Sequence, residues 1–233
     1  MKKITGLLLA ALLLICTVGA GRPILADDDP TAEPTSEPIW KEGLLTLGTV
    51  SGDVYENTTL GYGCKLEGWT IADAAAIAAM NNIGESLVSA DVQELIRQGG
   101  SFIEFSASSA DNLQSITVTF QDIEKNYGAA ASLFTVDQLV EAMLPMLPSM
   151  LENVGFSDVK AESAQIPLGT DLHPGIVITS KIYGVDAYQK EACIRCGDYM
   201  AFVCVSSFVS DATDDILKLF YPLTETVVYS PAD

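Results

Sequence analysis

Cys193 and Cys196 are the residues whose types and spacing most directly suggest chemistry. In Cys193-Ile194-Arg195-Cys196 two residues separate the cysteines, as in the dithiols of thiol–disulfide oxidoreductases. A redox dithiol has its first cysteine at a helix N-terminus, where the helix dipole lowers the pKa of the thiol. The sequence around this pair alternates as a β-hairpin does, which favours a structural role. Thiol–disulfide exchange by this pair remains an alternative function.

The cysteines as a set also favour structural bonds. Removal of an N-terminal leader that contains Cys16 leaves an even set of four: Cys64, Cys193, Cys196 and Cys204. Even numbers of cysteines in exported chains commonly form disulfides, because the compartment is oxidising. All four are therefore disulfide candidates. Inert thiols are the alternative if the compartment oxidises poorly.

The expected hairpin limits which of these thiols can pair. Residues 196–197 suit a two-residue turn, which places Cys193 and Cys204 on one face but about 13 Å apart along the strand. A disulfide spans at most about 7 Å between Cα atoms. We therefore expect Cys193 to bond Cys196 across the turn, or Cys64 from another strand.

Other catalytic patterns are missing from the sequence. His173 is the only histidine, and no cysteine or acid stands at metal-ligand spacing beside it. The nucleophile elbow, the phosphate-binding glycine loop and the dinucleotide fingerprint are also missing. Ser157 and Lys160 match the serine–lysine spacing of penicillin-binding enzymes, but the companion motifs do not occur, so we interpret the match as chance. We expect no catalytic residue, no metal ligand and no cofactor.

Acidic side chains dominate the charge of the chain. Its 233 residues include 31 Asp and Glu against 12 Lys and Arg, a formal net charge of −19. Binding to nucleic acid requires a basic surface, so this composition excludes it. The acid pairs are dispersed, as is ordinary for a solvated surface. A sensor of cations such as calcium is a second alternative function.

The N-terminus is typical of a signal peptide. A basic start over residues 1–3 precedes an apolar run over residues 7–18, which is too short to span a bilayer as a mature helix. Candidate cleavage sites follow after Ala20 and Ala26. Cutting after Ala20 leaves 10 basic against 31 acidic residues, a net charge of −21. We expect residues 1–26 to be a signal peptide and the mature protein to be secreted or at the cell surface.

Cys16 lies within this apolar run and raises the question of a lipid anchor. A lipid-modified cysteine normally follows a small residue, whereas the bulky Ile15 precedes Cys16. The sequence therefore disfavours lipoprotein processing. We interpret Cys16 as an apolar member of the signal peptide.

A spacer and a single domain follow the leader. Residues 27–42 are rich in Asp, Pro, Thr and Glu and have almost nothing to bury, which predicts an extended acidic spacer. The residues that follow are rich in apolar side chains, with interruptions at regular intervals, and no second linker divides them. We therefore expect one globular domain over residues 43–233, without membrane insertion of the mature domain.

Apolar periodicity in this domain predicts hairpins interleaved with a few helices. The expected strands lie within residues 49–66, 102–108, 115–122, 159–166, 175–183, 185–194 and 199–206. The expected helices are 70–80 with Thr70 as its cap, 89–98 with Ser89 as its cap, one from Thr135 that prolines interrupt, and one from Ser210. Without repeated βαβ units, this order indicates an α+β fold, an antiparallel sheet covered by helices.

The strand at residues 115–122 shows the alternation most clearly. Ser115, Thr117 and Thr119 alternate with apolar residues. In an antiparallel sheet this pattern predicts one packed face and one solvated face.

The opening of the domain resembles a known family. Tyr55-Glu56-Asn57, then Leu60-Gly61-Tyr62 and Gly68-Trp69, is similar to the start of the PsbP-like superfamily. The photosystem extrinsic subunit, the Ran-binding Mog proteins and many exported bacterial proteins share that fold. The chain departs from the pattern at Leu66, where the family has proline.

This resemblance covers about residues 45–223. It implies an antiparallel sheet packed between α-helices, an α/β/α sandwich, in proteins with accessory or partner-binding roles and generally without catalysis. It carries over no functional residue, because the matched positions are turns and core. The expected function is a non-catalytic, exported accessory or binding domain whose partner is an unknown protein or small molecule at the cell envelope.

Overall fold

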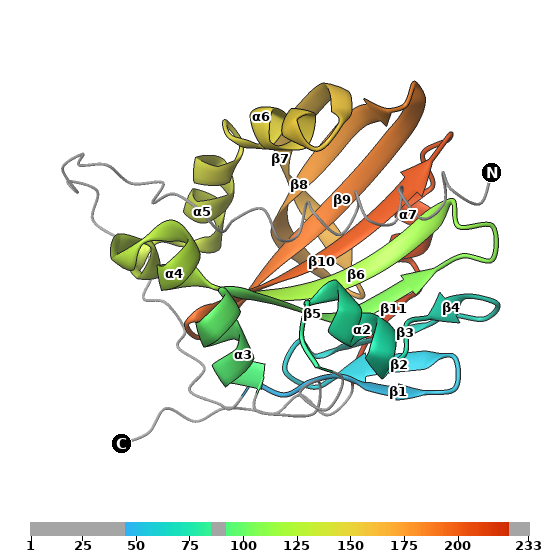
Figure 1. Cartoon of the computed structure of the whole chain (residues 1–233), viewed down its shortest axis with the longest axis horizontal. Helices are drawn as coiled ribbons and strands as arrows, with labels where there is room; N and C mark the ends of the chain where they lie inside the picture. The colour runs from blue at the N-terminus through green and yellow to red at the C-terminus, as the bar shows by residue number, and fades with distance from the viewer. Residues whose placement is uncertain (1–44, 85–91, 224–233) are drawn as a thin grey trace.

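The computed structural model of the chain describes residues 45–84 and 92–223 (Figure 1). The expected signal peptide, the expected spacer and Ser89 lie outside the described residues. The strands are β1 (Thr49–Ser51), β2 (Val54–Asn57), β3 (Tyr62–Lys65), β4 (Thr70–Ile71), β5 (Ser101–Ser108), β6 (Gln114–Asp122), β7 (Phe156–Leu168), β8 (Asp171–Ile182), β9 (Val185–Cys196), β10 (Tyr199–Phe208) and β11 (Phe220–Pro222). The helices are α2 (Ala74–Met80), α3 (Val92–Gly99), α4 (Ile123–Tyr127), α5 (Val136–Met143), α6 (Leu147–Asn153) and α7 (Thr213–Leu217), with a 3₁₀ helix η2 at Ala129–Leu133.

The larger of two sheets has seven antiparallel strands in the order β4-β5-β6-β10-β9-β8-β7 (Figure 1). Strands β7 to β10 pair consecutively as a meander, which confirms the run of strands predicted in the second half of the chain. The predicted hairpin of β5 and β6 is also present. Because β10 pairs with β6, hairpin and meander join into one continuous sheet.

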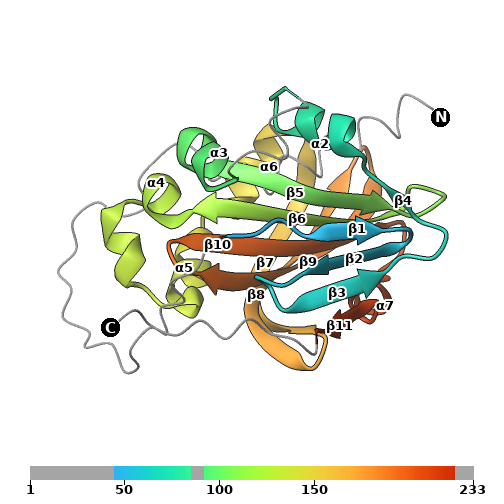
Figure 2. The same ribbon diagram turned by 90° about the horizontal axis from the view of Figure 1, so that it is seen from below.

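The smaller sheet is antiparallel, in the order β1-β2-β3-β11. Figure 2 shows β1, β2 and β3 side by side. The sequence predicted two strands in residues 49–66, but a turn at residues 52–53 adds a third. Strand β11 was not predicted: after α7 the chain returns as a short strand along β3. Tyr55 of β2 stacks on Phe105 of β5 with 4.0 Å between ring centroids, so the two sheets pack face to face.

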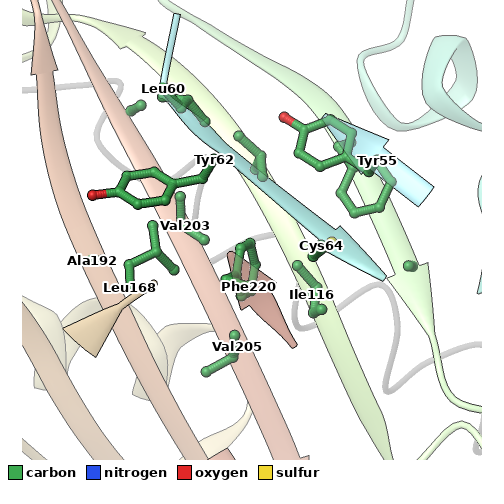
Figure 3. Close-up of a cluster of buried hydrophobic side chains, with 14 of the residues drawn as sticks. Tyr55, Leu60, Tyr62, Cys64, Ile116, Leu168, Ala192, Val203, Val205 and Phe220 are labelled. Atoms are coloured by element: carbon green, nitrogen blue, oxygen red, sulfur yellow. The ribbon is translucent and has the colours of Figure 1, made fainter. Parts of the chain in front are cut away.

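The large sheet therefore has two different faces. We call the side toward the small sheet the small-sheet face, and Figure 3 shows its core, in which Cys64 of β3 lies among side chains of both sheets. We call the opposite side the helix face. There α5 and α6 enclose a second core over Ile176 and Ile178 of β8. The described residues thus form a mixed α+β architecture that is mostly antiparallel sheet.

Local sequence signals explain where α5 and α6 begin and end. Thr135 and Gln138 form the predicted capping box at the start of α5: the backbone N–H of Gln138 donates to Thr135 Oγ1 over 3.3 Å, and that of Thr135 donates to Gln138 Oε1 over 2.9 Å. Helix α5 ends before Pro145, and Pro148 lies in the first turn of α6. Proline is tolerated there because the first N–H groups of a helix have no partner within it.

The prediction that Thr70 caps a helix was wrong. Thr70 pairs with Ser108 as part of β4, and the N-cap of α2 is Asp73, whose Oδ1 accepts the backbone N–H of Ala76 over 2.8 Å. An aspartate is as good an N-cap as a threonine, so the strand pairing decides between them. The last helix is also shorter than predicted, because α7 begins at Thr213.

The turn between β9 and β10 lies one residue later than predicted. Cys196 pairs with Tyr199, so Gly197 and Asp198 form the two-residue loop. Gly197 has a φ of 64°. A type II′ turn requires such a positive φ at its first central position, where glycine has no steric cost, and this requirement fixes the register of the whole hairpin.

Candidate functional site: a polar band on the helix face

Side chains alternate between the two faces along every strand of the large sheet. On β6, the side chains of Ile116, Val118 and Phe120 point to the small-sheet face and are all 0 % exposed. The residues between them point to the helix face. The registers of β5, β6, β9 and β10 bring polar residues of that face together across four strands.

Two neighbouring cross-strand rows on the helix face are almost entirely polar. We call them, together with the adjacent Thr119, the polar band: Ser106 and Ser108 of β5, Ser115, Thr117 and Thr119 of β6, Cys204 and Ser206 of β10, and Gln189 and Glu191 of β9. Residues as far apart in the sequence as Ser106 and Ser206 thus form one surface. The band adjoins the apolar part of the helix face at Ile176 and Ile178 of β8, which lie opposite Glu191 and Gln189.

The prediction of a solvated face on β6 was wrong, because the polar band is buried. Ser115 is 5 % exposed, Thr117 4 % and Thr119 0 %. All other members of the band except Ser108 are buried too. Alternation in the sequence identifies the polar face correctly but does not determine whether that face meets water.

Hydrogen bonds satisfy only part of the polar band. Gln189 Nε2 donates to Ser206 Oγ over 3.2 Å, and Cys204 Sγ lies 3.7 Å from the same oxygen. Gln189 Oε1 and Thr119 Oγ1 are buried and have no hydrogen-bond partner among the described residues. A buried oxygen without a partner costs about 1–3 kcal/mol, so such atoms call for an explanation. A ligand that donates hydrogen bonds to them supplies one.

Two ionisable groups near the band, Tyr127 and Cys193, have raised pKa values. Burial, followed by the charges of Cys193 and Glu191, raises the pKa of Tyr127. Burial, followed by the charges of Glu191 and Cys204, raises the pKa of Cys193. Both groups are therefore neutral near pH 7. The Tyr127 hydroxyl donates to Gln121 Oε1 over 2.6 Å, which extends the polar network beyond the band.

The described helices lie to either side of the polar band. Helices α2 and α3 contact β5, and α5 contacts β8 and β9. In Figure 1 the middle of β6 and β10 is seen between these two groups. Helix α7 contacts β10 from the small-sheet face, where its Asp214 pairs with Lys190 Nζ at 2.5 Å. Among the described residues, no other helix has extensive contacts with β10.

Among the described residues, no two cysteines form a disulfide with each other. Cys64 lies in the core between the sheets, where burial raises its pKa to about 12. Cys193 is on the helix face, and Cys196 is beside the turn and half-buried. Because the turn is formed by Gly197 and Asp198, Cys193 lies opposite Phe202. Cys193 and Cys204 are therefore two residues apart along the hairpin, whereas the predicted turn placed them four apart.

His173 of β8 forms a cluster with Tyr62 and Asp171. Its Nε2 is 2.8 Å from the hydroxyl of Tyr62, which also donates to Asp171 Oδ2 over 2.7 Å. Burial lowers the pKa of His173, with the nearby Asp171 acting in the opposite direction. Ser157 and Lys160, the pair with the serine–lysine spacing, are both exposed on β7.

A buried carboxyl group that the sequence did not reveal joins the two sheets. A β-bulge in β5 turns Glu104 toward the small sheet, where Glu104 Oε1 accepts hydrogen bonds from the Tyr55 hydroxyl, from Asn57 Nδ2 over 2.8 Å and from the Gly48 N–H over 3.2 Å. Its Oε2 is buried and has no hydrogen-bond partner in the part of the chain that the structure describes. Burial raises the pKa of Glu104 to about 7, although these hydrogen bonds lower it.

A cavity of about 250 Å³ lies between α5 and strands β7 and β8. Two carboxylates of α5 line it, and each has a hydrogen bond from β7: Ser163 Oγ donates to Glu141 Oε1 over 2.5 Å, and Gln165 Nε2 to Asp137 Oδ1 over 3.5 Å. Anywhere in the described ranges, this cavity included, no three His, Cys, Asp or Glu side chains are grouped so that they could hold a metal ion. No described helix is long and apolar enough to span a membrane.

Comparison with known proteins adds no family to these observations. No protein-family model matches the chain, and no curated protein matches it.

Proposed function

We propose that this chain is a non-catalytic, exported binding domain of the cell envelope that takes a small polar ligand on the polar band. The observation that carries the proposal is the pair of buried oxygens without partners, Thr119 Oγ1 and Gln189 Oε1, within a polar surface built from four strands. Binding sites place a few polar groups on a rigid scaffold, and a central sheet provides one.

Export is supported by the sequence of the N-terminus. The basic start, the apolar run over residues 7–18 and the small residues after it are those of a signal peptide, and the acidic spacer that follows is suited to separating a domain from a surface. We further propose that the chain is a distant PsbP-like protein with that family's sandwich of sheet and helices. The motif around Tyr55 and Asn57 supports this relationship.

Thiol–disulfide exchange is less well supported. The attacking species in exchange is a thiolate, which requires a lowered pKa and access to solvent. Cys193 is 1 % exposed, and its burial raises its pKa. It lies on a strand, where no helix dipole stabilises a thiolate.

A cation-binding role is the second candidate, and the cavity beside α5 favours it. Asp137 and Glu141 line this cavity together with the hydroxyl of Ser163 and the amide of Gln165. Calcium prefers oxygen ligands of these kinds but takes six to eight of them. The four side chains therefore supply part of a coordination shell.

The proposal can be tested with the protein expressed with its own leader and recovered after export. Native mass spectrometry after incubation with the low-mass fraction of a cell-envelope extract should show a bound adduct. The adduct should be lost in Thr119→Val and Gln189→Leu, which remove the oxygens without partners, and kept in the exposed control Leu133→Ala. An adduct that survives both band variants places the ligand elsewhere and contradicts the proposal.

Calcium chloride serves as a parallel arm of the same experiment. A rise in Tm with calcium that is lost in Asp137→Asn would favour the cation role over the polar ligand. Failure to recover the protein outside the cytoplasm would contradict export.

A further inference from the structure

The cavity beside α5 is lined by two carboxylates that a ligand can reach. Asp137 and Glu141 are four residues apart on α5, so both extend from the same side of the helix, and both are exposed. Each accepts a hydrogen bond through one oxygen from a neutral side chain of β7, Glu141 from Ser163 and Asp137 from Gln165. The second oxygen of each carboxylate takes no part in these bonds. Like charges at this spacing destabilise a helix, and a cation between them removes that cost.

The described lining of the cavity contains no Lys or Arg. Ser163 lies opposite Ile176, whose side chain is in the core of the helix face. Lys160 is three residues before Ser163 on the same strand, and it therefore points to the small-sheet face. Lys181 of β8 forms an ion pair with Asp158 at 3.4 Å. A ligand can therefore supply the positive charge that the lining lacks.

The size and the walls of the cavity fit an organic cation better than a metal ion. A water molecule takes about 30 Å³ of liquid volume, so a cavity of about 250 Å³ has room for a ligand of several non-hydrogen atoms. Val140 and Pro174 add aliphatic surface that methylene groups can contact. Calcium needs six to eight oxygen ligands, whereas an ammonium group has three N–H donors and a positive charge, which suit two carboxylates.

We propose that this cavity binds the ammonium group of a primary alkylamine between Asp137 and Glu141. Val140 and Pro174 then contact the methylene groups next to the ammonium. The inference rests on the cation-binding candidate function, whose cation it identifies as organic, and it does not depend on the polar band. A free amine and the end of a lysine side chain share this chemistry, and the experiment separates the two sources.

Titrations of the exported protein, followed by the NMR shifts of its backbone amides, test the inference. Pentylamine and pentan-1-ol have the same number of non-hydrogen atoms and differ only in the end group. We expect pentylamine to shift amides of α5 and β7 and to bind roughly tenfold more tightly than the alcohol, because hydrogen bonds between charged groups are the stronger ones. The double variant Asp137→Asn, Glu141→Gln should remove this preference, whereas Glu152→Gln, at an exposed carboxylate on α6, should keep it. Circular dichroism and Tm establish that the variants are folded.

A second variant separates binding in the cavity from pairing with surface charge. Ser163→Phe keeps both carboxylates, suits a strand and fills the cavity from β7. It should abolish the binding of pentylamine. Undiminished binding in this variant would mean that the amine pairs with exposed carboxylates outside a cavity, and it would overturn the inference.

The remaining arms identify the source of the cation. Nα-acetyllysine N-methylamide presents a lysine side chain as a protein does: binding at the same amides assigns the site to a partner's lysine, and binding of pentylamine alone assigns it to a free amine. If pentan-1-ol binds as tightly as pentylamine, or if neither binds, the inference fails. If calcium chloride shifts the same amides and pentylamine does not, the inference fails while the cation-binding candidate stands. None of these outcomes affects the test of the polar band by the envelope adduct.

Discussion

Strand β6 is buried on both faces of the large sheet, but the two faces differ in what they bury. On the small-sheet face, β6 contributes Ile116, Val118 and Phe120, which pack against a second sheet in a closed core. On the helix face, the same strand contributes Ser115, Thr117 and Thr119, buried among other polar groups. Burial of apolar groups is explained by the hydrophobic effect, whereas burial of polar atoms without partners opposes stability. A buried surface that costs stability is therefore the better candidate for a functional site.

The largest effect is expected on the small-sheet face. Phe120→Ala should lower the free energy of unfolding by about 3–5 kcal/mol, because it leaves a cavity between two sheets that cannot easily collapse. Urea denaturation followed by circular dichroism measures the change. The exposed control Leu133→Ala, at a side chain that is 75 % exposed, should change stability by less than about 0.5 kcal/mol. A loss below about 1 kcal/mol for Phe120→Ala would contradict a closed core.

Glu104 is an ionisable residue on the otherwise apolar small-sheet face, and its titration should make the stability of the protein depend on pH. Burial raises its pKa from 4.5 to about 7, so the folded state favours the protonated form. Its contribution to stability is therefore fully present below about pH 4.5 and is lost as pH rises through about 7, by up to about 3 kcal/mol.

Chemical denaturation between these pH values, compared between wild type and Glu104→Gln, measures this effect. The variant should lack this pH-dependent part of the stability, whereas Glu152→Gln, at an exposed carboxylate on α6, should retain it. An unchanged pH dependence in Glu104→Gln would show that the group titrates normally.

Reciprocal substitutions at neighbouring residues of β6 sharpen the comparison at the smallest scale. Val118→Thr places a hydroxyl on the apolar face and should destabilise by about 1–3 kcal/mol. Thr119→Val removes a buried hydroxyl without a partner and should be neutral or stabilising, by up to about 1 kcal/mol. Equilibrium unfolding of both variants gives the signs. A strong loss of stability in Thr119→Val would mean that the band is a structural network and not a site.

Much of the fold could be predicted from local patterns. Alternation located the strands β5 to β10, and the Thr135 capping box located the start of α5, because these signals act between residues close in the sequence. The predicted turn at Cys196 and Gly197 was wrong by one residue, since glycine suits either central position of a tight turn and the pairing of the strands decides which one it takes.

Only part of the candidate site could be predicted from the sequence. Polar alternation on β6 could be recognised in the sequence, but the burial of that face could not. An alternating polar face is usually solvated, and only the packing of other elements shows that this one is buried. No pattern in the sequence identified Glu104 as a buried residue. Its partners Tyr55 and Asn57 are 49 and 47 residues away, and a bulge, which the local pattern does not reveal, turns it toward them.

Local sequence patterns were enough to predict the α+β class, the order of most elements and the polar face of β6. These properties depend on backbone propensity and on the two-residue period of a strand. Three features came only from the tertiary structure. The small sheet covers one face of the large sheet, and β11 completes the small sheet. On the other face, two polar rows from four strands lie together and are buried. Those features depend on contacts between distant residues, which a local pattern does not encode.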